Sequence, residues 1–247
     1  MSDKGLILLD FDGTLSDPVL LFEQYVPHLV TQFQEVSGGE YEAWSEATTS
    51  MLQTLTEEFQ DYFLKDPVAE YNGFMEHIYR RSVALVHEAM GLEPPADRLA
   101  FARNTQREAL QRTSALYGGV TEQLEALRIR GFEFWMASGQ ESDFLQAALV
   151  GAGLAHLPKQ WYGPDLINCA KESGEYYRRI FAEIGSNSSP LIVIDDLPVA
   201  LVWAQEFGAV TIQTHFDSAT PPAEVPGVSA VMTDWNQLPH ILSALAL

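Results

Sequence analysis

Two pairs of aspartates come directly after short apolar runs of the chain. Asp10 and Asp12 are one residue apart near the beginning, and Asp195 and Asp196 are adjacent in the second half. Neighbouring carboxylates repel each other unless a cation or a shared proton offsets their charge. A divalent metal with oxygen ligands is the simplest cation for this purpose. The four aspartates are therefore the first candidates for a site.

Other residues could bind an anion. Ser138 ends a further apolar run, and its hydroxyl could bind a phosphate oxygen with the amide of Gly139 beside it as a second donor. The chain has 34 acidic and 14 basic residues, which gives a net charge of -20. An anion site must therefore be made locally positive by a metal ion, a lysine or a helix N-terminus.

Short apolar runs are the elements that must position these groups. Runs such as 6–9 and 191–194 predict buried parallel strands. From Gly118 onward helical periodicity alternates with such runs, which predicts a parallel sheet with helices on both faces. The carboxyl ends of the strands then lie at one edge, where open α/β sheets bind their ligands. The predicted fold class is α/β.

The segment between the first apolar run and Gly118 has a different character. Asp17 and Pro18 form a helix start, with an acid at the N-cap and a proline at the first helical position. Apolar residues then recur every three or four positions as far as about Tyr117. This pattern predicts a small helical domain inserted into the larger α/β domain.

The stretch Asp10-Phe11-Asp12-Gly13-Thr14-Leu15 resembles the first motif of the haloacid dehalogenase-like (HAD) superfamily, most of whose members are phosphatases and other phosphoryl-transfer enzymes. The second motif of the family is a strand ending in Ser or Thr, which Ser138 matches. The fourth is a strand ending in acids, which Asp195 and Asp196 match. Many members have Gly-Asp there and another acid four residues later. Ala200 stands at that later position here, so we expect Asp195 to supply the second carboxylate.

The third motif of the family is a lysine shortly before a helix. Lys171 lies six residues before Tyr177 and fourteen before Gly185, which matches the family spacing. Glu172 departs from the pattern, because the family usually has proline after the lysine. Lys159 therefore remains an alternative to Lys171.

The resemblance implies a Rossmann-like, doubly wound parallel sheet as the core, formed by residues 1–16 and 117–247. Residues 17–116 would form an all-helical cap of the C1 type. The implied reaction is Mg²⁺-dependent hydrolysis of a small phosphorylated metabolite through an aspartyl-phosphate.

The same resemblance implies the role of each residue. Asp10 would be the nucleophile, and Asp12 would protonate the leaving alcohol and then activate water. Mg²⁺ would be held by Asp10, Asp196, the backbone carbonyl of Asp12, and Asp195 directly or through water. The phosphoryl oxygens would be bound by Ser138, Gly139 and Lys171.

Other reactions are known on this scaffold. Haloacid dehalogenases lack the acid at the Asp12 position and need no metal, so Asp12 and the pair Asp195-Asp196 argue against that reaction. A phosphonatase needs a cap lysine, and the inserted segment contains only Lys65. A sugar phosphomutase of the β-phosphoglucomutase type keeps the four motifs and remains open. So does a non-catalytic protein that binds a phosphorylated ligand.

Composition limits the partners and the setting. The acidic charge argues against nucleic acid and anionic membranes. With one cysteine and no apolar stretch of about 18 residues, we expect a cytoplasmic protein. Candidate anion contacts in the cap are Arg80, Arg81, Arg103 and Arg107, although a solvated or ion-paired state is favoured for each. The sequence does not define an oligomeric state.

Overall fold

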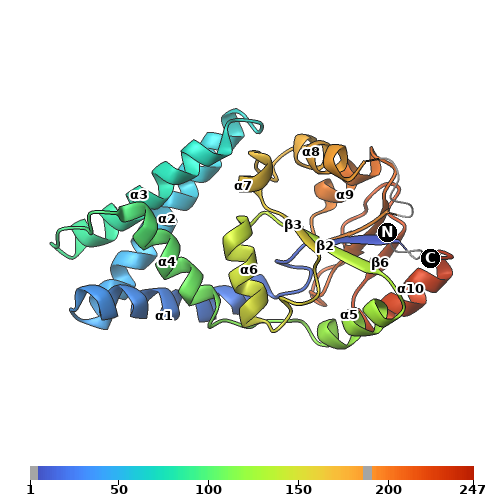
Figure 1. The fold of residues 1–247 in the computed structure, drawn as a ribbon, viewed down its shortest axis with the longest axis horizontal. Coiled ribbons are helices and arrows are strands. Elements are labelled where there is room, and N and C mark those ends of the chain that lie inside the picture. Colours follow the sequence, from blue (N-terminus) through green and yellow to red (C-terminus); the bar gives the residue numbers. More distant parts are fainter. Residues whose placement is uncertain (1–4, 186–190) are drawn as a thin grey trace.

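A computed structural model describes residues 5–185 and 191–247 (Figure 1). Its centre is a six-stranded sheet in the order β3-β2-β1-β4-β5-β6, and every neighbouring pair of strands is parallel. The strands are β1 (Leu6–Leu9), β2 (Glu133–Ala137), β3 (Gln160–Tyr162), β4 (Leu191–Asp195), β5 (Val210–Thr214) and β6 (Ala230–Met232). The predicted α/β class with a parallel sheet is confirmed.

Helices cover both faces of the sheet. Successive side chains of a strand point to opposite faces, so alternate residues pack against different helices. Leu8 and Val193 pack with α8 (Gly174–Ile184) and α9 (Pro198–Gln205). Ile7 and Leu9 pack on the other face, in the cluster that includes buried side chains of α5 (Val120–Ile129), α6 (Ser142–Gly151) and α10 (Leu238–Ala244). The apolar runs of the central strands are thus apolar because both of their faces are buried.

An all-helical insertion, the cap, follows β1 and forms one end of the molecule in Figure 1. It contains α1 (Pro18–Ser37), α2 (Tyr41–Lys65), α3 (Tyr71–Ala89) and α4 (Arg98–Leu110). Helix α1 begins where the sequence predicts, because the side chain of Asp17 accepts hydrogen bonds from the amides of Val19 and Leu20. The division of the chain at 16/17 and 116/117 remains our prediction.

The two connections between the core and the cap run side by side. The amide of Asp17 donates to the carbonyl of Ala115, and the amide of Tyr117 donates to the carbonyl of Leu15. The cap also contacts the core through Asn168, whose side-chain oxygen accepts from the amides of Tyr71 and Asn72 at the start of α3. These contacts position the cap over the end of the sheet.

Some elements were not expected from the sequence. Strand β3 has three residues, and helix α7 (Pro164–Ile167) has four, so neither produces a clear periodicity. The C-terminal helix α10 was also missed. Helix α8 begins at Gly174, three residues after Lys171. Within the two described ranges, the structure contains no helix that could cross a membrane.

Candidate active site

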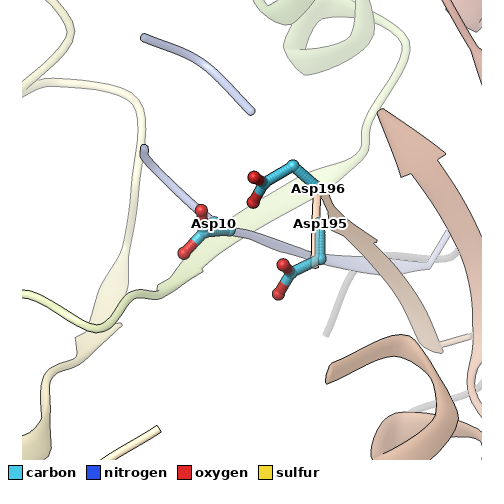
Figure 2. A group of neighbouring side chains, drawn as sticks. All are labelled: Asp10, Asp195 and Asp196. Atoms are coloured by element: carbon cyan, nitrogen blue, oxygen red, sulfur yellow. The ribbon is translucent and has the colours of Figure 1, made fainter. Parts of the chain in front are cut away.

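Strands β1, β2 and β4 are neighbours at the centre of the sheet, and the predicted aspartates and Ser138 lie at their carboxyl ends, whereas Lys171 lies between α7 and α8. Figure 2 shows Asp10 beside Asp195 and Asp196, although 185 positions separate Asp10 from Asp195 in the chain. Each of the three aspartates offers a carboxylate oxygen, and these oxygens all lie within 4.8 Å of one another. The parallel pairing of β1 with β4 is what brings the two acidic motifs together.

Lys171 is the cation at this site. Its Nζ lies 2.8 Å from Asp10 Oδ1 and 2.7 Å from Asp195 Oδ2, and the lysine is buried. Burial by itself would lower the pKa of Lys171, but the two carboxylates raise it well above its ordinary value. The alternative, Lys159, is exposed and pairs with Glu133, which begins β2 at the opposite end of that strand. The structure therefore places Lys171, and not Lys159, among the aspartates.

Both carboxylate oxygens of Asp195 are already occupied by donors. The hydroxyl of Tyr177 donates to Oδ2 over 2.9 Å, and the amide of Leu197 donates to Oδ1 over 3.0 Å. Because Lys171 also binds Oδ2, Asp195 helps to hold the lysine ammonium beside Asp10. The spacing of Lys171 and Tyr177 in the sequence pointed to this tyrosine without revealing its contact.

Asp196 lies against the backbone of Gly13. Gly13 has a φ of +74°, and a Cβ on it would lie less than 3.0 Å from Oδ2 and from Cγ of Asp196. Glycine is thus required both by the backbone conformation and by the space that the carboxylate occupies. Burial, with the charge of Asp195, raises the pKa of Asp196 to about 6. The first and fourth motifs are in direct contact here.

Asp12 has one oxygen bound and the other without a partner. Gln140 Nε2 donates to Asp12 Oδ2 over 2.6 Å, whereas the buried Oδ1 has no hydrogen-bond partner among the described residues. Burial raises the pKa of Asp12, and the Gln140 bond and Lys171 partly oppose this rise. Sequence reasoning missed Gln140, because a glutamine two residues after a strand-end serine carries no signal of its own.

Ser138 is buried at the end of β2, and its Oγ accepts from the amide of Gln140 over 3.2 Å. Its carbonyl oxygen accepts from the hydroxyl of Tyr176 over 2.8 Å. Gly139 follows, and a Cβ on it would meet nothing within 4 Å. Gly139 and Gln140 line a cavity beside Asp12.

This cavity, of about 470 Å³, lies between the cap and the core. The core contributes Asp12, Gly139, Gln140 and Glu141 to its floor. Its walls are mainly apolar, with the aliphatic side chains of Leu21, Met75 and Leu110 beside six aromatic ones, Phe22, Tyr25, Phe59, Tyr71, Tyr79 and Phe144. No arginine or lysine of the described chain lines it.

None of the four candidate cap arginines lines this cavity. Arg103 on α4 pairs with Glu141 Oε2 over 2.8 Å and with Asp143 Oδ2 over 3.1 Å, at the start of α6. Burial raises the pKa of Glu141 to about 7, against the opposing charge of Arg103. Arg81 pairs with Glu58, and Arg107 donates to the side chain of Asn104. Arg80 is exposed. The ion pairs of Arg103 therefore tie the cap to the core.

Comparison with protein families gives one clear match. Residues 5–202 match the family model described as a haloacid dehalogenase-like hydrolase. This match includes the whole cap and all the candidate site residues discussed above. A comparison with curated proteins finds no match.

Solved structures share the fold over nearly the whole chain. The putative HAD-hydrolase YfnB from Bacillus subtilis, bound to magnesium, is 20% identical and has a TM-score of 0.62, covering 96% of this chain and 98% of its own. The L-2-haloacid dehalogenase from Xanthobacter autotrophicus with chloropropionic acid covalently bound is 17% identical and has a TM-score of 0.61, covering 98% and 99%. A HAD phosphatase from Thermococcus onnurineus is 14% identical and has a TM-score of 0.62, covering 96% and 97%.

Proposed function

The chain belongs to the haloacid dehalogenase-like hydrolases, and we propose that it is a Mg²⁺-dependent phosphomonoester hydrolase. The observation that carries the proposal is Asp12, whose buried Oδ1 has no hydrogen-bond partner among the described residues and whose side chain lines the cavity between the cap and the core. An alcohol leaves from phosphorus far more easily when an acid protonates it. A halide ion leaves without a proton, so a dehalogenase would have no use for this acid.

The carboxylates fit a divalent cation. Asp10, Asp195 and Asp196 are gathered within reach of one ion, and all the available donors are oxygens, as Mg²⁺ prefers. Burial and the neighbouring aspartates raise the pKa of Asp10 despite Lys171, and they also raise that of Asp196. A bound Mg²⁺ would neutralise this excess negative charge and polarise a phosphoryl oxygen. The proposed ligands are Asp10, Asp196 and the carbonyl of Asp12, with Asp195 acting through water because its oxygens already accept hydrogen bonds.

In the proposed reaction, Asp10 and Asp12 each act twice. A carboxylate oxygen of Asp10 attacks phosphorus while the bond from phosphorus to the ester oxygen breaks, and Asp12 gives its proton to that oxygen. Asp12 then takes a proton from water, which attacks phosphorus and releases phosphate from Asp10. The raised pKa of Asp12 suits the first of its two roles, because a protonated acid is needed at that step.

The phosphoryl group needs donors on its remaining oxygens. We assign these to the hydroxyl of Ser138, the amide of Gly139 and the ammonium of Lys171. Lys171 is already held between Asp10 and Asp195, so it is aligned with the nucleophile before the substrate arrives. Positioning and charge neutralisation are the main requirements of phosphoryl transfer.

Hydrolysis of p-nitrophenyl phosphate tests the proposal. We expect turnover with Mg²⁺, no turnover with EDTA, and a loss of at least about a thousandfold in the Asp10→Asn variant. Asp61→Asn is a matched control, because Asp61 lies on the exposed side of α2, where it pairs with Lys65. Full turnover by Asp10→Asn would refute the proposed nucleophile.

A further inference from the structure

We propose that the substrate is the phosphate ester of an apolar, uncharged alcohol, and that the cavity selects against esters carrying a second anionic group. This inference rests on the proposed phosphatase function and names the class of substrate that the site would take. It is drawn from the walls of the cavity, from the atoms on its floor and from the positions of the cations around it.

The walls favour apolar groups. The cavity of about 470 Å³ has the size of a small-molecule site, and most of its lining is aromatic or aliphatic. Side chains of all four cap helices contribute, among them Phe22 on α1, Phe59 on α2, Tyr79 on α3 and Leu110 on α4. An apolar leaving group gains free energy by leaving water for such a surface, whereas a sugar would lose hydration of its hydroxyls.

The floor of the cavity carries two acidic side chains, those of Asp12 and Glu141. The buried atoms Asp12 Oδ1, Gln140 Oε1 and Glu141 Oε1 have no hydrogen-bond partner among the described residues, and all three residues line the cavity. Glu141 is 2% exposed. Gln140 donates to Asp12, and the leaving alcohol needs the proton of Asp12, so these two side chains offer no free donor to a second anionic group.

No arginine or lysine of the described residues lines the cavity, so no cation there attracts a second anion. Lys171 is buried between Asp10 and Asp195 and does not line the cavity, and Arg103 is held by Glu141 and Asp143. A second anion in the cavity would therefore be buried without a counter-charge, which is strongly unfavourable. The same argument disfavours a phosphomutase, because a bisphosphate intermediate would have to place its second phosphate in this space.

Esters with similar leaving groups can test the selectivity. Benzyl phosphate, 4-carboxybenzyl phosphate and glucose 6-phosphate all release a primary alcohol, so their intrinsic reactivities are similar. With Mg²⁺ present, we expect kcat/KM for benzyl phosphate to exceed that for each of the others by at least about tenfold. Equal or better turnover of 4-carboxybenzyl phosphate or glucose 6-phosphate would overturn the inference.

A charge placed on the cavity wall should change the preference. Phe22 lines the cavity and is 55% exposed, so Phe22→Arg can be introduced without opening the core. We expect this variant to reduce the preference for benzyl phosphate over 4-carboxybenzyl phosphate by at least about fivefold. Val36→Arg is the matched control, because Val36 is 64% exposed on the same helix and lies about 21 Å further along it. An unchanged preference in Phe22→Arg, or an equal change in Val36→Arg, contradicts the inference.

Binding separates this inference from the proposed reaction. Benzylphosphonate and 4-carboxybenzylphosphonate have no ester bond to break, so calorimetry with Mg²⁺ present measures binding without turnover, and the difference between the two ligands reports the effect of the carboxylate in the cavity. Tighter binding of benzylphosphonate without turnover of any ester would support the cavity assignment and refute the phosphatase. Turnover of the esters with equal binding of the two phosphonates would leave the phosphatase standing and refute the substrate class.

Discussion

The contact between Gly13 and Asp196 leads to a sharp prediction for Gly13→Ala. The new Cβ would lie less than 3.0 Å from Oδ2 and Cγ of Asp196, whereas ordinary contacts begin at 3.4 Å. The carboxylate must therefore move by about 1 Å to restore normal packing. Mg²⁺ holds its oxygen ligands at about 2.0–2.1 Å and tolerates errors of only about 0.2 Å. We expect the affinity for Mg²⁺ to fall by about 10- to 100-fold.

The same substitution also strains the backbone. A non-glycine residue at a φ of +74° costs about 1–2 kcal/mol, so Gly13→Ala should unfold at lower urea concentration than the wild type. Isothermal titration with Mg²⁺ gives the affinity, and urea unfolding with EDTA gives the stability without metal. The two measurements separate the loss of the ligand from the loss of stability.

Gly91→Ala is a matched control for this strain. Gly91 has a φ of +66°, and a Cβ on it would meet no atom within 4 Å. It should lose a similar amount of stability and keep the wild-type affinity for Mg²⁺. If Gly13→Ala also kept that affinity, either Asp196 would not be a ligand or Gly13 would not determine its position, and the reasoning would fail.

Three further predictions concern charge. Lys171→Met leaves Asp10 and Asp195 buried without their cation, so urea unfolding in EDTA should show a loss of about 3–5 kcal/mol; unchanged stability would contradict the ion pairs. Burial raises the pKa of Glu141 from 4.5 to about 7, so the folded state binds its proton more tightly and the wild type should lose stability as pH rises through this range. Glu141→Gln removes the titration, and its stability relative to the wild type should therefore rise by up to about 3 kcal/mol between pH 5 and pH 8; a constant difference would refute the shift. Mg²⁺ at about 100 times its dissociation constant should stabilise the wild type by about 2.7 kcal/mol in thermal unfolding, and Asp196→Asn should abolish most of this effect; the absence of any effect in the wild type would exclude the metal site.

Much of the fold could be read from local patterns in the sequence. The run Leu6–Leu9 is apolar at every position because both faces of β1 are buried, and the polar residue Asp10 follows it directly. Asp17 with Pro18 marks the start of α1 through backbone chemistry that involves only neighbouring residues. Periodicity then distinguishes the helical insertion from the alternating strands and helices that follow. These signals are local, so one sequence is enough to detect them.

The candidate site was predictable as a set of residues but not as a set of contacts. Strand ends and family spacing singled out Asp10, Asp12, Ser138, Lys171 and the pair Asp195-Asp196, since the carboxyl ends of parallel strands lie at one edge. Because Glu172 stands where the family usually has proline, the sequence left both Lys171 and Lys159 as candidates for the third motif. Only the tertiary structure places Lys171 among the carboxylates and Lys159 beside Glu133.

The remaining features depend on how distant segments meet. The bond from Gln140 to Asp12 joins residues 128 positions apart, and it exists because β2 lies beside β1. The apolar cavity exists because four cap helices approach the end of the sheet, while Arg103 binds Glu141 instead of facing a substrate. Hydrophobic periodicity reveals which side of a helix is buried, but it does not reveal what that side faces. The central strands, the cap and the acidic residues could thus be predicted from the sequence. Which groups touch depends on the order of the strands and the placement of the cap, so the contacts required the folded chain.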